Sequence, residues 1–433
     1  MSTSKIEGPC ASCPQKRCCS AYRQLNEDLF SKTTFIRPSA LDSVDSALDS
    51  FVVTYMKSLD ELVREGRLKP DWKDFCLAAA FDLAVTAIYT NILIEEGVSF
   101  SQKAFRSGNT AAYFPYTWMC PKRVSEGIDR EKCYLPGAIK RGPKYYPNTD
   151  LLAKPGGRMI GDVGIKVLKS IFRMLLRRNG HHSIMRDGGG FRGEFDLTVT
   201  DEDFLIFIEV KAKPLVCYPL KLELTESCDE DHFEWHDVAM RTVKKMSLFM
   251  GATGEEIPLT RPSAADFDVW PIGDLTRYVA VPENLEKAID NWSRHIFGYR
   301  KWEGEDPQTR WLRFGCGNFS VVENGARVEK RVANTKELPG LDRTDDIKKG
   351  AAQLLKFARF KFECPEDKIA CILAGNTWAE THDEHYVEPM LRLKIRRGDV
   401  PDSREEWIFD AVLGLTRNEF NREELRKYFS LEV

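Results

Sequence analysis

The sequence predicts an α/β protein in which a mixed central sheet is flanked by helices and preceded by a mostly helical N-terminal region. Three observations support this fold class. Residues 195–210 have the pattern of an apolar β-hairpin, and helical periodicity occurs directly before it at 161–178. A second periodic segment, 345–362, is followed by the apolar strand 369–374. Helices and strands that follow one another in this way are typical of layered α/β folds.

Length and charge set the domain organisation and the kind of surface. The 433 residues exceed one typical domain, and 42% hydrophobic residues allow sizeable cores. The net charge of -3 argues against a surface coated by nucleic acid, so local basic patches must make any DNA contact. We divide the chain into a helical, cysteine-containing region 1–150, a core 151–400 with an insertion at 215–340, and a C-terminal extension 401–433.

Roughly the first 110 residues have mainly helical patterns. Residues 1–8 are polar, so no signal peptide is expected and we predict a cytoplasmic protein. The most apolar segment, 75–93, contains Asp82 and Asn91 and has charged neighbours, which favours a buried helix over a membrane span. An amphipathic helix precedes it, with one apolar side made of Val44, Leu48, Phe51, Tyr55, Leu59 and Leu62.

Six of the twelve cysteines form a candidate metal site. In a reducing cytoplasm a disulfide framework is not expected. Thiolates two residues apart can chelate one soft ion, so zinc or an iron-sulfur cluster is expected here, with zinc slightly favoured. The pattern weakly resembles small zinc- or iron-chelating modules, and the alternative is a tail with free thiols. The candidate ligands are Cys10, Cys13, Cys18, Cys19, Cys120 and Cys133.

The helix expected at 161–178 carries a basic stripe on one flank. Its members are spaced three, four and four residues apart, so they share one side of a helix. Such a stripe suits a phosphate backbone, although charge stripes are more often simply solvated faces. The predicted DNA-binding residues are Lys166, Lys169, Arg173 and Arg177.

The hairpin brings ionisable groups to the end of an apolar strand. Residues two apart in a strand share a face, so Glu209 and Lys211 point the same way. The acidic residues 201–203 supply a turn of hairpin length. Folding the strands about that turn sets Asp196 opposite Glu209.

Charges at such a place need compensation. A buried carboxylate without a partner is costly, and a divalent metal would meet that need. Magnesium takes carboxylate oxygens, keeps several waters, and is commonly held by one or two acids together with substrate phosphates. A metal held in this way supports phosphodiester hydrolysis, with the lysine orienting water or offsetting charge on the phosphate.

Gly193-Glu194-Phe195-Asp196, then twelve residues, then Glu209-Val210-Lys211 resembles the motif of the PD-(D/E)xK nuclease superfamily. Phe195 stands where that family has proline. The resemblance implies a restriction-endonuclease-like core, Asp196 and Glu209 as Mg²⁺ ligands, and Lys211 as the catalytic lysine. The family often uses a further acid from the preceding helix. Asp162 and Glu194 are the two candidates for that role.

A second tripeptide of the same form, Glu366-Asp367-Lys368, serves as an internal control. It follows Pro365 and reads as a solvated turn, without the upstream acid and the apolar strand of the first copy. In the resembling family a helix carrying a glutamine often follows the hairpin, and the segment 345–362 with Gln353 fits that place. Gln353 itself is more simply a surface amide of that helix.

The function predicted from the sequence is a Mg²⁺-dependent endonuclease that hydrolyses DNA, of restriction or defence type. The alternative is a non-catalytic nucleic-acid-binding or sensing protein that keeps the nuclease-like fold and a cysteine metal site. The sequence leaves open whether the substrate is DNA or RNA, whether it is modified, and whether the chain forms a homodimer. No membrane partner is expected.

Overall fold

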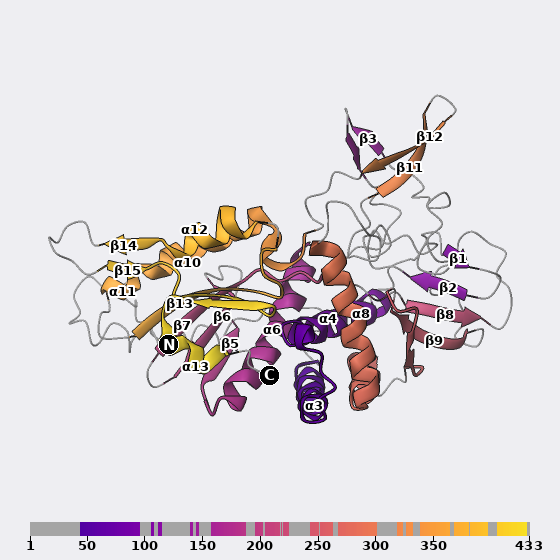
Figure 1. The fold of residues 1–433 in the computed structure, drawn as a ribbon, viewed down its shortest axis with the longest axis horizontal. Helices are drawn as coiled ribbons and strands as arrows, with labels where there is room; N and C mark the ends of the chain where they lie inside the picture. The colour runs from indigo at the N-terminus through magenta and orange to yellow at the C-terminus, as the bar shows by residue number, and fades with distance from the viewer. Residues whose placement is uncertain are drawn as a thin grey trace, which may run out of the picture. The chain divides into compact units, whose positions relative to one another are not determined.

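The computed structural model describes 44–95, 105–107, 111–114, 139–141, 144–146, 157–187, 195–201, 204–216, 218, 220–224, 243–250, 252–262, 267–300, 318–323, 326–331, 338–363, 368–380, 382–396 and 405–430. These residues fall into two compact units (Figure 1). Unit 1 holds the described parts of 172–212 and 340–431, and unit 2 those of 38–171 and 213–339.

Unit 1 is built on a mixed six-stranded sheet, which confirms the predicted fold class. Its order is β17-β16-β13-β7-β6-β5. Strand β13 runs parallel to both β7 and β16, and the other neighbours are antiparallel. The strands are β5 (Ile184–Asp187), β6 (Leu197–Thr200), β7 (Phe204–Val210), β13 (Lys368–Gly375), β16 (Ala411–Gly414) and β17 (Arg417–Phe420).

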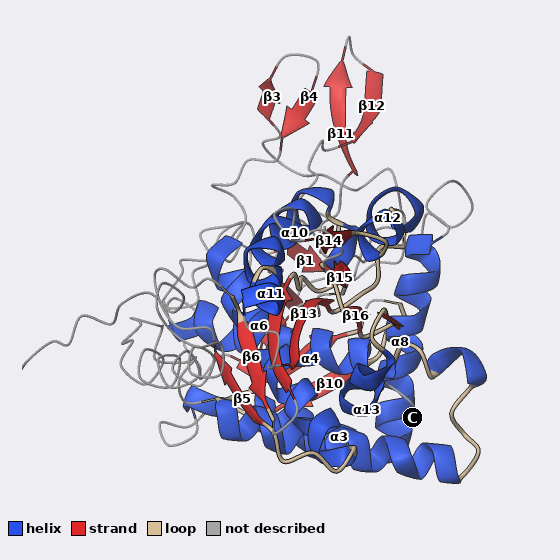
Figure 2. Cartoon of the chain, turned by 90° about the vertical axis from the view of Figure 1, so that its left-hand side faces the viewer, coloured by secondary structure: helices blue, strands red, loops and turns tan. Residues whose placement is uncertain are grey.

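Helices cover both faces of this sheet. Helices α10 and α11 lie on one face and α13 on the other (Figures 1 and 2). The segment predicted as one helix over 345–362 is two helices, because α10 ends at Ala358 and α11 begins at Phe360. The bounds are α6 (Gly157–Arg178, in unit 1 from Phe172 on), η8 (Gly340–Asp342), α10 (Thr344–Ala358), α11 (Phe360–Glu363), η9 (Asp383–Val387), α12 (Glu388–Leu391), η10 (Glu423–Leu425) and α13 (Arg426–Phe429). A separate hairpin pairs β14 (Lys394–Arg396) with β15 (Glu405–Trp407).

Strand β7 is buried along its whole length, as its apolar sequence predicts. Phe207 stacks on Phe357 of α10, with ring centroids 4.8 Å apart. On the opposite face Phe204 meets Tyr428 of α13 edge to face at 5.9 Å. Because side chains alternate along a strand, Glu209 belongs to the same face as Phe207, the face covered by α10.

Unit 2 contains the helical N-terminal region. The amphipathic helix α3 has the predicted apolar side buried, and α4 is buried from Cys76 to Asn91. None of the described helices combines the length and the hydrophobicity needed to cross a bilayer. The helices are α3 (Asp45–Arg64), η1 (Pro70–Trp72), α4 (Cys76–Glu95), η6 (Phe267–Val269), α7 (Ile272–Val279) and α8 (Pro282–Arg300), with the first part of α6.

An antiparallel five-stranded sheet, β1-β2-β8-β9-β10, completes the main body of unit 2. Its strands are β1 (Phe105–Ser107), β2 (Ala111–Phe114), β8 (Leu220–Leu224), β9 (Val243–Phe249) and β10 (Glu256–Leu259). Two further hairpins pair β3 (Ile139–Arg141) with β4 (Lys144–Tyr146), and β11 (Asn318–Glu323) with β12 (Ala326–Arg331).

Asp82 explains why an acid interrupts the apolar sequence of α4. Its side chain is fully buried. Its Oδ2 accepts hydrogen bonds from the backbone N–H groups of Leu215 (3.1 Å) and Val216 (2.8 Å), and from Trp292 Nε1 (2.7 Å). The carboxylate therefore anchors the chain near residue 215 to α4 and α8.

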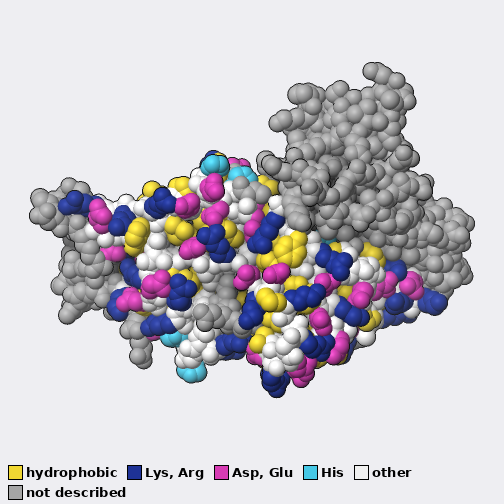
Figure 3. Space-filling model, viewed as in Figure 1, with side chains coloured by type: hydrophobic (Ala, Val, Ile, Leu, Met, Phe, Trp, Pro, Cys, Tyr) yellow, Lys and Arg dark blue, Asp and Glu magenta, His cyan; other side chains and the backbone are white. Residues whose placement is uncertain are grey.

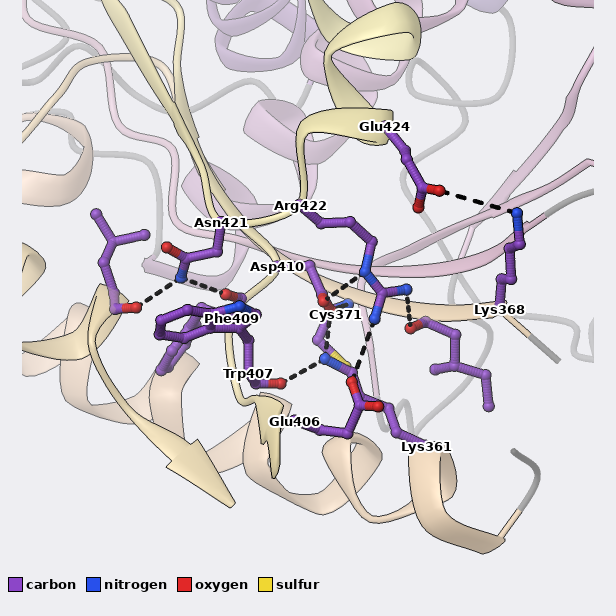
Figure 4. A network of polar contacts seen from close by, with 12 residues as sticks. Lys361, Lys368, Cys371, Glu406, Trp407, Phe409, Asp410, Asn421, Arg422 and Glu424 are labelled. Carbon is purple, nitrogen blue, oxygen red and sulfur yellow. Dashed lines mark hydrogen bonds and ion pairs between the residues drawn. The ribbon is translucent and has the colours of Figure 1, made fainter. Parts of the chain in front are cut away.

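In unit 1, residues after 400 belong to the central sheet, since β16 and β17 form one of its edges. A buried ionic network holds them there (Figure 4). Asp410 is fully buried and accepts hydrogen bonds from Lys361 Nζ and from the backbone N–H of Cys371. Arg422 lies with its Nε 3.2 Å from Asp410 Oδ1 and its terminal nitrogen 3.3 Å from Glu406. Two cations and two carboxylates thus balance each other.

We expect Lys361→Met to lower the free energy of unfolding by about 3–5 kcal/mol, because it leaves a buried carboxylate with one cation fewer. Lys368→Met is the matched control. Its ammonium is 4.0 Å from Glu424, and both side chains are more than half exposed, so the change should cost less than about 1 kcal/mol. Urea denaturation of both variants tests this, and equal losses would contradict a network role for Lys361.

Candidate active site

The hairpin register sets the site. Leu197 lies across from Ile208, and Thr200 across from Leu205. Asp201 N–H donates to Phe204 O at 3.0 Å and closes the turn where the sequence predicts it. One step beyond the paired residues, this register places Asp196 opposite Glu209, as predicted.

Three ionisable side chains converge at this end of β7. Asp196 Oδ2 accepts a 2.7 Å hydrogen bond from the backbone N–H of Val210, which fixes that carboxylate. Lys211 Nζ donates to Glu209 Oε1 and lies 4.0 Å from Asp196 Oδ2. Glu209 is buried, and Asp196 and Lys211 are half-buried. Two carboxylates therefore share one ammonium group at the edge of a hydrophobic core.

The backbone beyond β7 is held by β13. Lys211 N–H donates to Ala374 O at 2.7 Å, so the parallel pairing of the two strands continues to the lysine. A Cβ on Gly375 would come within 3.0 Å of Lys211 O and 2.7 Å of Leu341 Cγ. The close approach of these segments therefore requires glycine at that position.

Gly350 of α10 lies against the same side chains. A Cβ at this residue would be 3.6 Å from Glu209 Cγ, 3.7 Å from Lys211 Cε and 2.6 Å from Leu373 Cδ1. Gly350 is not among the site residues predicted from the sequence. A signal was present, because glycine inside a periodic helix costs about 1 kcal/mol relative to alanine and often marks a close contact.

The electrostatics of the pair favour a bound cation. Burial, and then the nearby charge of Asp196, raise the pKa of Glu209 to about 7, while Lys211 opposes that rise. The two carboxylates thus repel each other in a poorly solvated place. A positive ion would relieve that repulsion.

The donor set fits magnesium. Asp196 and Glu209 offer carboxylate oxygens, the hard ligands that Mg²⁺ prefers, and this ion is commonly held by one or two acids with water completing its shell. Within the described residues no group of three or more His, Cys, Asp or Glu side chains is placed to hold a metal. At this end of β7, Asp196 and Glu209 are the two acids that would hold the ion.

The candidates for a further acid are not brought to this site by a described contact. Glu194 lies outside the described residues, and so does the whole set of predicted cysteine ligands. Asp162 is half-buried near the start of α6, in the part of that helix that belongs to unit 2. Gln353 accepts a 2.6 Å hydrogen bond from Lys356 on the surface of α10.

Lys166, the first residue of the predicted basic stripe on α6, is not exposed. Its side chain is buried, and its Nζ lies 2.7 Å from Asp45 Oδ1 of α3. One turn on, Ser170 Oγ donates to Asp49 of α3 at 2.6 Å. This side of α6 packs against an acidic side of α3. Of the other stripe residues, Lys169 and Arg173 are half-buried and Arg177 is exposed.

No family model, no curated protein and no solved structure matches this chain. A fold hosts many functions, so the chemistry of the site itself must carry the functional proposal. The site consists of the buried carboxylate of Glu209, the half-buried carboxylate of Asp196, the ammonium of Lys211 and the helix α10 packed against them.

The raised pKa of Glu209 predicts how stability depends on pH. A carboxyl group that titrates near 7 when folded and near 4.5 when unfolded binds more protons in the folded state between these values, so stability falls as the pH rises across that range. Without added metal, the free energy of unfolding of the wild type should fall by about 3 kcal/mol, relative to that of Glu209→Gln, between pH 4.5 and pH 7.5. Denaturant unfolding measures this, and parallel curves for the two proteins would contradict it.

The close contact at Gly350 predicts opposite effects of one substitution at two helical glycines. Gly350→Ala must displace the buried Leu373 and should cost about 1–3 kcal/mol despite the better helix propensity of alanine. Gly161→Ala is the matched control, because nothing lies within 4 Å of its added Cβ, and it should stabilise α6 by about 0.5–1 kcal/mol. Thermal unfolding compares the stabilities of the two variants. A Gly350→Ala variant more stable than the wild type would show that the space beside Gly350 can hold a methyl group, which would contradict the close contact.

Proposed function

We propose that this protein is a metal-dependent nuclease that hydrolyses phosphodiester bonds of DNA. The observation that carries the proposal is the convergence of Asp196, Glu209 and Lys211 at the end of β7. Support also comes from the order of elements, since the resemblance to PD-(D/E)xK nucleases implies a helix before the hairpin and a helix and a strand after it. Here α6 precedes the hairpin, and α10 leads to β13, which pairs parallel with β7.

Asp196 and Glu209 are the proposed metal ligands. A Mg²⁺ ion bound by them would polarise a phosphoryl oxygen and offset its negative charge. The backbone N–H of Val210 orients the Asp196 carboxylate, and the ammonium of Lys211 orients that of Glu209. Both acids are thus held in place before a substrate arrives, which lowers the reorganisation that catalysis requires.

Lys211 is the proposed catalytic lysine. In the hydrolysis, a water oxygen forms a bond to phosphorus and the bond to one ester oxygen breaks, which leaves a phosphate monoester and a hydroxyl group. The water loses a proton and the departing oxygen gains one. A half-buried ammonium beside the two acids can hold the attacking water and stabilise charge that develops on the phosphate.

The finer features of the function remain part of the proposal. Endonucleolytic cutting and a restriction or defence role are what the resemblance implies. The complete set of two acids and a lysine favours hydrolysis over the alternative, a nucleic-acid-binding or sensing protein, because binding alone does not need it.

The test is cleavage of supercoiled plasmid DNA with Mg²⁺. The wild type should cut, and Lys211→Ala should cut at least about 100-fold more slowly, the usual loss for a residue that assists proton transfer or charge stabilisation. Lys368→Ala is the control, because this lysine ends the second tripeptide of the same form and is more than half exposed. Equal cutting by wild type and Lys211→Ala, or no cutting by either, would contradict the proposal.

A further inference from the structure

We propose that Lys349 and Lys356 of α10, called here the lysine row, bind backbone phosphates that flank the scissile phosphodiester. The inference rests on the proposed function and adds to it a surface that receives the nucleic acid strand. It also replaces the basic stripe on α6, whose first member is buried against α3.

The helix geometry places the row beside the acids. Gly350 faces Glu209 and Lys211, and Lys349 is its neighbour on the helix, about 100° further round. Lys356 follows Lys349 by seven residues, about two turns, so both lysines lie along the same side of α10. The positive charge of Lys356 also acts on Glu209, where it opposes the rise in the pKa of that carboxyl. The row therefore borders the site.

Both lysines are available to a ligand. Their side chains are exposed, and Lys356 Nζ donates to the neutral amide oxygen of Gln353 at 2.6 Å. Neither forms an ion pair with a carboxylate among the residues that the structure describes. Arg343 at the start of the same helix is different, because it is paired with Asp346 at 2.9 Å. The two ammonium groups thus keep their charge for a partner from outside.

A site with two carboxylates repels the polyanion on which it is proposed to act. Cations next to it are needed to hold phosphates close, and in this chain they must be local because the net charge is -3. On the face drawn in Figure 3, basic and acidic side chains are interspersed over the described residues. The row spans about 10.5 Å, or about three nucleotide steps of 3.4 Å.

The same helix offers matched controls. Lys348 of α10 and Arg359, the residue directly after the helix, are also exposed cations, but they lie on another side of it. Lys348 lies over the ring of Tyr386 at 5.4 Å, and Arg359 over the ring of Phe360 at 4.9 Å. Replacing either one removes one positive charge from α10 or its C-terminal end without changing the row.

The experiment measures binding of a fluorescein-labelled 20-base-pair DNA duplex by anisotropy, in Ca²⁺ and at several NaCl concentrations. Lys349→Ala and Lys356→Ala should each weaken binding by about tenfold at low salt and reduce the salt slope by about 1, as expected for loss of one phosphate contact. Lys348→Ala and Arg359→Ala should change binding by less than about twofold. In Mg²⁺, Lys349→Ala should raise KM and leave kcat unchanged, since Lys349 acts in binding alone.

The outcomes separate this inference from the proposed function. If the wild type cuts DNA but all four variants bind the duplex as tightly as the wild type does, the proposed role of the lysine row is wrong and the proposed nuclease activity stands. If the row variants alone weaken binding and no protein cuts, the row stands and hydrolysis is wrong. If the wild type binds neither the duplex nor a single strand of the same sequence, both proposals fail.

Discussion

The burial of Glu209 beside Asp196 is the constraint on which the rest of the site depends. A carboxylate at the end of a fully buried strand loses its hydration, and a second acid next to it adds repulsion. Lys211 compensates part of that cost by donating to Glu209. The glycine of α10 then lets a helix close over both side chains. The fold therefore tolerates an electrostatically unfavourable pair at the place where a cation and a phosphate could meet.

Two ionic clusters on the same sheet show why only one of them suggests chemistry. Around Asp410, two carboxylates face two cations, and three of the four side chains, those of Lys361, Glu406 and Asp410, are buried. That balance suits a structural role, since a buried ion pair stays stable only when fully matched. At the end of β7, two carboxylates share one ammonium, and Asp196 and Lys211 reach the surface. An excess of negative charge at an accessible edge is typical of a site that binds a cation.

The sequence predicted those features that depend on local periodicity. The pairing of Asp196 with Glu209 follows from a strand period of two and from the length of the turn. Features set by distant packing were not accessible. The charge spacing on α6 could not reveal that Lys166 meets Asp45, more than a hundred residues away in sequence. Gly350 acquires its meaning only from its distance to Leu373, and the place of β16 in the sheet depends on contacts with β13.

The central claim is that Asp196 and Glu209 together hold a divalent ion, and calorimetric titration with Mn²⁺ at pH 7 tests it most directly. Wild type should bind an ion that Asp196→Asn and Glu209→Gln both lose. Because the pKa of Glu209 is about 7, binding should also release protons, which buffers of different ionisation enthalpy reveal. If both variants bound Mn²⁺ with the affinity and the proton release of the wild type, the proposed metal site would be contradicted.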